Sequence, residues 1–271
     1  ITANSPAALK QTTANWEAVL WHEFCHVVTL QATRNRMPRW LSEGISVYEE
    51  KQANAVWGQA INPTYRKMIL EGELTPVGQL SAAFLRARSA LHLQFAYYES
   101  SLVVEYIIET RGLDAMRKVL KDLHEGVYIN AALAKHVAPM AELEANFEAW
   151  ARKLAEATAP DADWTELPPQ AIRGGEALDA FLKEHPDSFA GLMLLASRQI
   201  GQEKWGDAKS TLAHILKLYP DYGGNDSALV MLAFVHRELD ETDAEYVTLR
   251  KFAKVNADHV PTFVRLMELA R

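Results

Sequence analysis

Hydrophobic residues along most of this chain recur with the period of an α-helix. Ser5-Pro6 is a typical helix start, and the segment 16–32 that follows carries its apolar residues at helical spacing. These residues are Val19, Leu20, Phe24, Val27, Val28 and Leu30. Few windows show the alternation of β-branched and aromatic residues that is typical of a strand. We therefore expect a mainly α protein.

A reversal of the chain is predicted at the polar turn 33–36. Pro38 then opens a second helix, from about Arg39 to Gln52. Two helices joined in this way should face each other. Further helices are expected at about 91–110, 113–124, 129–137 and 141–157, and Gly112 should end the first of these.

Residues 158–175 interrupt the helical pattern. They contain three prolines and the pair Gly174-Gly175 among acidic residues. Such a composition breaks helices and tolerates exposure to solvent. We interpret this segment as an interdomain linker between a first domain, residues 1–157, and a second domain, residues 176–271.

The second domain contains an internal repeat. His185-Pro186-Asp187 recurs as Tyr219-Pro220-Asp221 after 34 residues, which is the period of tetratricopeptide helix pairs. The first unit fits this pattern well, at Leu192, Leu195, Ala196, Ala208, Leu212 and Ile215. The second unit, 228–258, is displaced by an insertion, and 261–270 resembles the first helix of a third. The pattern predicts a short α-solenoid of tetratricopeptide-like helix pairs.

The chemistry of the chain is concentrated in its first helix. His22-Glu23-Phe24-Cys25-His26 is an H-E-x-x-H pattern, whose two histidines lie on one face of a helix and can meet one metal ion. Catalytic zinc takes three protein ligands and a water molecule. Glu23 is placed to take a proton from that water rather than to bind the metal.

A third ligand is predicted on the second helix. Trp40-Leu41-Ser42-Glu43-Gly44 places the Glu43 carboxylate 17 positions after His26, on the helix that should pack antiparallel to the first. The apolar neighbours of Glu43 indicate a buried setting, where an unpaired carboxylate is costly. We therefore expect His22, His26 and Glu43 to be the ligands of one Zn²⁺ ion.

Together with His22–His26, the segment 36–50 resembles the peptidase MA-like group of gluzincin zinc metallopeptidases. The resemblance covers roughly residues 15–155 and continues weakly into 96–106. It implies a zincin-like helical peptidase domain, and proteins of this group often carry tetratricopeptide repeats. The group also uses a tyrosine or histidine to stabilise the oxyanion, a role for which the resemblance offers Tyr97, with Tyr98 pointing elsewhere.

One departure from the gluzincin pattern concerns the support of the histidines. In that group an acidic residue four positions after the ligand glutamate orients a histidine, whereas this chain has Val47 there. Ser46, Glu49 or Glu50 could take that role.

Charge and composition limit the classes of partner and the cellular location that we expect for this protein. The net charge of −7, from 35 acidic and 28 basic side chains, offers phosphate backbones no broad attractive surface, so nucleic acid is not expected. No stretch approaches the roughly 18 to 20 apolar residues of a transmembrane helix. The single cysteine, Cys25, can form no internal disulfide and points away from the histidine face. The resemblance, and a first residue that is not methionine, favour the cell envelope or the exterior.

The expected function is zinc-dependent hydrolysis of a peptide or protein substrate by a metal-activated water, with Glu23 as the general base. Two other functions stay open. In one, the zinc fold is inactive or structural and the repeats bind a protein partner. In the other, the same site is a zinc amidase that hydrolyses a non-protein amide.

Overall fold

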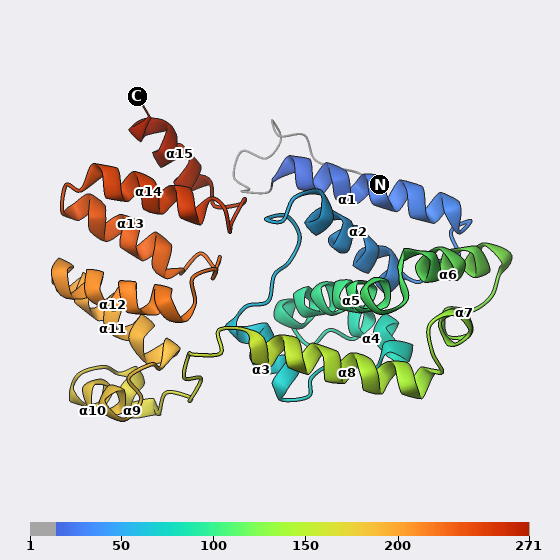
Figure 1. Ribbon diagram of the computed structural model, residues 1–271, viewed down its shortest axis with the longest axis horizontal. Coiled ribbons are helices and arrows are strands. Elements are labelled where there is room, and N and C mark those ends of the chain that lie inside the picture. The colour runs from blue at the N-terminus through green and yellow to red at the C-terminus, as the bar shows by residue number, and fades with distance from the viewer. Residues whose placement is uncertain (1–14, 271) are drawn as a thin grey trace. The chain divides into compact units, whose positions relative to one another are not determined.

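The computed structural model describes residues 15–270 and is all helical over that range. The described residues form fifteen α-helices, one short 3₁₀ helix and no strand, which confirms the expected mainly α fold (Figure 1). The predicted helix start at Ser5-Pro6 lies outside the described residues. None of the described helices combines the length and the apolarity needed to cross a bilayer.

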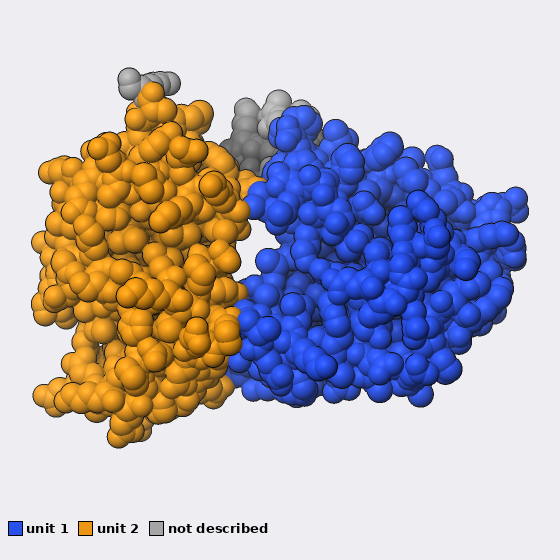
Figure 2. Space-filling model, in the orientation of Figure 1, with its two compact units in different colours: residues 1–158 blue, residues 159–271 orange. Residues whose placement is uncertain are grey.

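The chain divides into two compact units, Ile1–Thr158 and Ala159–Arg271 (Figure 2). The helices of unit 1 are α1 (Trp16–Ala32), α2 (Arg39–Ala53), α3 (Pro63–Leu70), η2 (Val77–Gln79), α4 (Leu80–Leu85), α5 (Ala90–Arg111), α6 (Leu113–Glu125), α7 (Ile129–His136) and α8 (Met140–Ala157). Those of unit 2 are α9 (Pro169–Ile172), α10 (Glu176–Glu184), α11 (Phe189–Gly201), α12 (Trp205–Leu218), α13 (Ala228–Glu238), α14 (Thr242–Phe252) and α15 (Val260–Leu269).

Local chemistry explains how α1 begins and how the chain turns into α2. The Asn15 side chain accepts hydrogen bonds from the first backbone amides of α1, as N-caps of this type do. At the other end, the Thr33 hydroxyl donates to the Thr29 carbonyl, and Arg34 and Asn35 take positive φ angles of 53° and 58°. This tight turn reverses the chain so that α2 packs against α1, as predicted.

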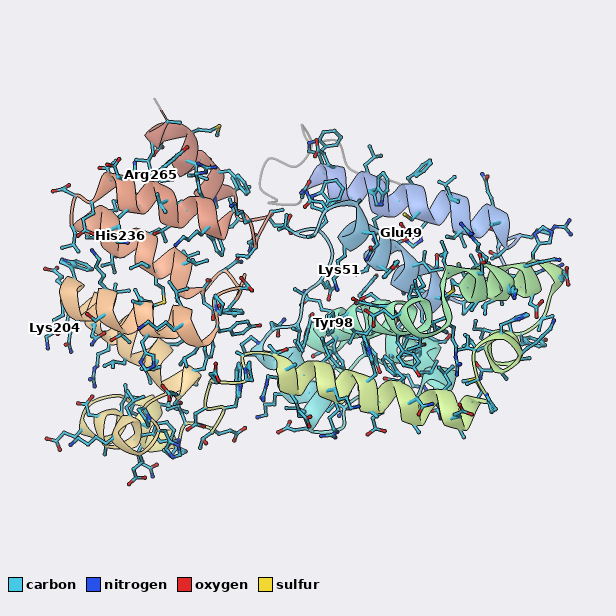
Figure 3. The ribbon with its side chains drawn as sticks, in the orientation of Figure 1. Glu49, Lys51, Tyr98, Lys204, His236 and Arg265 are labelled. Atoms are coloured by element: carbon cyan, nitrogen blue, oxygen red, sulfur yellow. The ribbon has the colours of Figure 1, made fainter. Side chains whose placement is uncertain are left out.

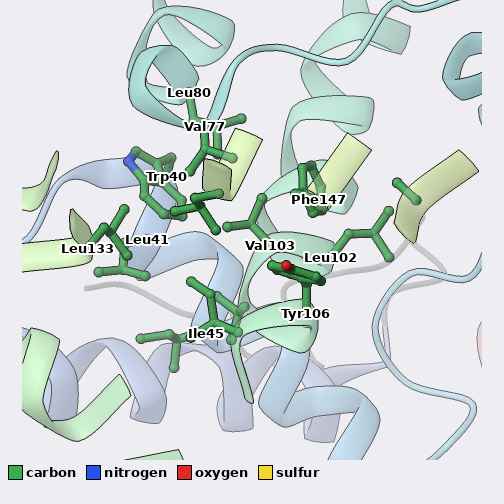
Figure 4. Packing of buried hydrophobic residues seen from close by; sticks show 14 of the residues in the cluster. Trp40, Leu41, Ile45, Val77, Leu80, Leu102, Val103, Tyr106, Leu133 and Phe147 are labelled. Atoms are coloured by element: carbon green, nitrogen blue, oxygen red, sulfur yellow. The ribbon is translucent and has the colours of Figure 1, made fainter. Parts of the chain in front are cut away.

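Helices α2 and α5 form the centre of the unit 1 core. Trp40, Leu41 and Ile45 of α2 interlock with Leu102, Val103 and Tyr106 of α5 (Figure 4). The two backbones approach closely at Gly44, where an added Cβ atom would lie 2.5 Å from the Ser100 carbonyl oxygen. Only glycine permits this approach, and the crossing therefore fixes the position of the neighbouring Glu43.

The apolar residues that predicted α1 do not mark its buried side. Leu20, Phe24 and Val28 are 53%, 58% and 50% exposed, and Thr29 is the only α1 residue that is fully buried. The side that faces α2 instead carries the two histidines of the motif. The spacing thus identified the helix, while its contacts with α2 include the polar pairs of His22 and His26 with Glu43.

Unit 2 is built from neighbouring helix pairs. Helix α11 packs with α12, and α13 packs with α14. Residues expected from the 34-residue period are buried here, among them Leu192, Ala196, Ala208, Leu212 and Ile215. Their assignment to the tetratricopeptide class stays a prediction.

The segment 158–175, interpreted from its composition as a linker, contributes to the packing of unit 2. Ala171 of α9 is fully buried, and the Asp163 backbone amide donates to the Asp187 carbonyl at 2.9 Å. The prolines shorten the helical structure here without excluding it, because Pro169 stands in the first turn of α9, where its missing amide is no loss.

Candidate metal centre

His22, His26 and Glu43 come together between α1 and α2. The Nε2 atoms of both histidines lie 3.2 Å from the same oxygen, Glu43 Oε2. The three side chains are 13% to 18% exposed, and one possible ligand atom from each lies within 4.8 Å of the others. They form a group that could hold a metal ion.

Hydrogen bonds to the other nitrogen of each ring orient the two histidines. His22 Nδ1 is hydrogen-bonded to Glu50, while His26 Nδ1 is 2.8 Å from Ser42 Oγ and 3.3 Å from Ser46 Oγ. Such contacts fix the ring and direct Nε2 toward the metal. Of the three residues considered from sequence for this role, Glu50 contacts His22 and Ser46 contacts His26. Ser42 was missed, because its only sequence signal is a hydroxyl one residue before Glu43.

The electrostatics of this group favour a bound cation. Burial lowers the pKa of His22, but hydrogen bonds with Glu43 and Glu50 outweigh this effect and raise the pKa to about 9. Burial raises the pKa of Glu43, while hydrogen bonds with His22 and His26 lower it to about 2. Two carboxylates around two half-buried imidazoles thus stabilise positive charge. Together with the two-nitrogen, one-carboxylate donor set, this fits a divalent metal ion.

Glu23 lies on α1 beside this group and outside it. Its side chain is half-buried, and it has no hydrogen bond or ion pair with any residue in the range 15–270. Its neighbour Cys25 is not part of the group either. Burial, with the nearby Glu49 and Glu50 carboxylates, raises the pKa of the Cys25 thiol to about 11, so this sulfur stays protonated at neutral pH.

Tyr97 is connected to the group through a residue that the sequence analysis missed. The Arg39 guanidinium donates from Nη2 to Tyr97 Oη at 3.0 Å and from Nε to Glu43 Oε1 at 3.3 Å. Tyr98, in contrast, is labelled in Figure 3. It is buried and stacks on Tyr65, with 4.8 Å between the ring centroids. Of the two adjacent tyrosines, Tyr97 is therefore the one connected to this candidate metal-binding group.

Fold and site together define a class: a helical protein whose possible metal ligands come from two adjacent helices. The family model described as the Peptidase MA superfamily matches residues 7–153, more than half of the chain, and the protein belongs to that superfamily. Comparison with curated proteins and with solved structures gave no match. The family supports a metallopeptidase type of fold, in agreement with the resemblance noted from the motifs.

Proposed function

We propose that this protein is a zinc-dependent peptidase of the gluzincin type. The observation that carries the proposal is the convergence of His22 Nε2 and His26 Nε2 on Glu43 Oε2, each at 3.2 Å. Two imidazoles and one carboxylate are the donor set of a catalytic zinc site that keeps a position open for water. When bound, Zn²⁺ would polarise the scissile carbonyl and lower the pKa of a water molecule.

Glu23 is the proposed general base. It follows His22 directly on α1, and no partner within residues 15–270 competes for its carboxylate. A carboxylate in this position can take the proton from the attacking water and return it to the leaving amine. Tyr97 is the proposed oxyanion donor, because its hydroxyl is held near Glu43 through Arg39.

The first experiment measures the zinc content of the purified protein and its action on a mixed peptide library, read by mass spectrometry. We expect about one zinc per chain, lost in Glu43→Ala. Glu23→Gln should retain zinc and lose hydrolysis by about 100-fold or more. Glu17→Gln is the matched control, since Glu17 is an exposed glutamate on the same helix.

Three results would contradict parts of this proposal. Hydrolysis that survives Glu23→Gln would exclude this residue as the base. Zinc content that is indifferent to Glu43→Ala would exclude the three-ligand site. Stoichiometric zinc without cleavage of any peptide would favour a binding scaffold or a zinc amidase, and cleavage of a non-peptide amide would decide for the latter.

A further inference from the structure

Arg39 contacts side chains from two different helices at the metal-binding group. It is the first residue of α2, one turn before Glu43, whereas Tyr97 lies on α5. Its Nε donates to Glu43 Oε1 at 3.3 Å, and its Nη2 donates to Tyr97 Oη at 3.0 Å. A single planar cation therefore joins the third possible metal ligand to the tyrosine.

Aromatic packing holds this guanidinium in place although the side chain is 53% exposed. Its central carbon lies 5.0 Å from the ring centroid of Phe84, a buried residue of α4. The Phe84 ring in turn packs edge-on against Tyr97, with 5.0 Å between centroids. Stacking on an aromatic ring and two hydrogen bonds in fixed directions are contacts that arginine makes and lysine does not.

The contact with Glu43 determines which of its oxygens is available. Oε2 is the atom shared by His22 and His26, whereas Oε1 accepts the hydrogen bond from Arg39. A carboxylate held by one oxygen presents the other in a fixed direction, and such support sets the affinity of a metal site. Arg39 therefore prepares Glu43 to bind through Oε2 alone.

The contact with Tyr97 determines the role of its hydroxyl. A tyrosine hydroxyl has one hydrogen to donate and lone pairs to accept with, and a guanidinium can only donate. Tyr97 must therefore be the acceptor from Arg39. Its own hydrogen stays free to be donated to another oxygen, as an oxyanion donor requires.

We infer that Arg39 is a positioning residue that orients Glu43 for the metal and Tyr97 for the substrate. The inference about Tyr97 rests on the proposed peptidase function, whereas the inference about Glu43 requires only that the site binds zinc. This separation allows the two parts to be tested independently.

The test for Glu43 is zinc affinity, measured by competition with a chromophoric chelator and without any substrate. Arg39→Gln should weaken zinc binding by about 10-fold or more. Arg39→Lys keeps the charge near Glu43 and should lose less affinity than Arg39→Gln. Arg117→Gln removes an exposed arginine that pairs with Asp114 at 3.0 Å elsewhere in unit 1, and it should bind zinc as the parent does.

The test for Tyr97 is the kinetics of the zinc-loaded enzyme on a cleaved peptide. Arg39→Lys should lower kcat with little change in KM, because the lost contact orients a group that acts in the transition state. Tyr97→Phe should leave zinc affinity unchanged and lower kcat. Combining Tyr97→Phe with Arg39→Lys should cost less than the sum of the two single effects, since both remove the oriented Tyr97 hydroxyl.

Parent-like zinc affinity in Arg39→Gln would overturn the role at Glu43, and additive losses of kcat would overturn the role at Tyr97. If Arg39→Gln fails to fold, as judged by circular dichroism, Arg39→Lys decides both parts. If the parent protein binds zinc but cleaves no peptide, the proposed peptidase function is wrong, and the proposed role of Tyr97 is wrong with it. The chelator titration would still decide the role of Arg39 at Glu43.

Discussion

Glu50 shows how single residues outside the ligand set shape the metal-binding group. It lies seven residues after Glu43, two turns farther along the same face of α2, and forms a hydrogen bond with His22 Nδ1. Glu50→Gln removes the negative charge that supports the ring and should weaken zinc binding by about 10-fold. A chelator competition titration measures this.

Glu49→Gln is the matched control for this substitution. Glu49 is the adjacent glutamate on α2, and its carboxylate forms no hydrogen bond with either histidine of the group. Its substitution should leave the zinc affinity unchanged. If both variants lost affinity equally, the general acidity of α2 would explain the effect in place of a specific contact.

Glu99 gives unit 1 a dependence of stability on pH. It is 1% exposed on α5, and burial raises the pKa of its carboxyl to about 8 although Thr75 donates hydrogen bonds to it. Above pH 4.5 the unfolded chain loses a proton that the folded protein keeps. The contribution of Glu99 to the free energy of unfolding is therefore greatest below that pH, and it falls as pH rises toward 8.

The test compares denaturant unfolding of the parent and of Glu99→Gln at about pH 5 and pH 8. Glutamine is neutral at both values and can still accept from the Thr75 amide. The variant should therefore gain stability relative to the parent by an amount that grows by a few kcal/mol between the two pH values. Glu109→Gln, an exposed change on the same helix, should show no such growth.

The sequence indicated which candidate ligands come together, but not all of the residues that support them. His22, His26 and Glu43 follow from one helical period and one reversal of the chain, both of which are local properties. The part played by Arg39 depends on where α5 crosses α2 and on the direction of Tyr97, 58 residues away. No spacing along the chain carries that information.

At the scale of elements, the crossing of α2 and α5 connects core packing to the metal-binding group. Gly44→Ala would place a methyl carbon 2.5 Å from the Ser100 carbonyl oxygen, so the two backbones must move apart. We expect a loss of about 1–3 kcal/mol in the free energy of unfolding. Zinc affinity should fall as well, because Glu43 moves with the helix.

Thermal unfolding and chelator competition on the same samples test both effects. Gly206→Ala is the control, since an added Cβ atom at this helical glycine meets nothing within 4 Å. It should be neutral or slightly stabilising, because alanine favours helix more than glycine does. Unchanged stability in Gly44→Ala would mean that α2 and α5 can separate at their crossing without loss of packing energy, which would contradict this prediction.

Most helices of unit 1 were predicted to within about a residue, and three short ones were missed. The second helix, expected at about 39–52, spans Arg39–Ala53, and that expected at 91–110 spans Ala90–Arg111. Helices α3, η2 and α4, between residues 63 and 85, were not foreseen. Each is at most eight residues long, and a periodic pattern is hard to recognise over so few residues. Helix α7, as long as α3, was nevertheless predicted, at 129–137, and spans Ile129–His136.

At the scale of the whole molecule, each unit has its own hydrophobic core. The large core, with Trp40 and Phe147, lies entirely in unit 1, and the second, with Leu212 and Val235, lies entirely in unit 2. Unit 2 also has its own ion pairs, in which the buried Glu245, 1% exposed, accepts from Arg237 and from Arg265, which is labelled in Figure 3. Each unit thus contains what it needs to unfold as a separate cooperative transition.

Calorimetry of the full chain tests this independence. Zinc bound at the proposed site of the folded protein, and not to the unfolded chain, should stabilise only the transition of unit 1, by about 2.7 kcal/mol at 100 times its Kd. Glu245→Gln should lower only the other transition, by about 1–3 kcal/mol, because two arginines lose a charged partner. A single transition that responds to both zinc and Glu245→Gln would show that the units unfold together.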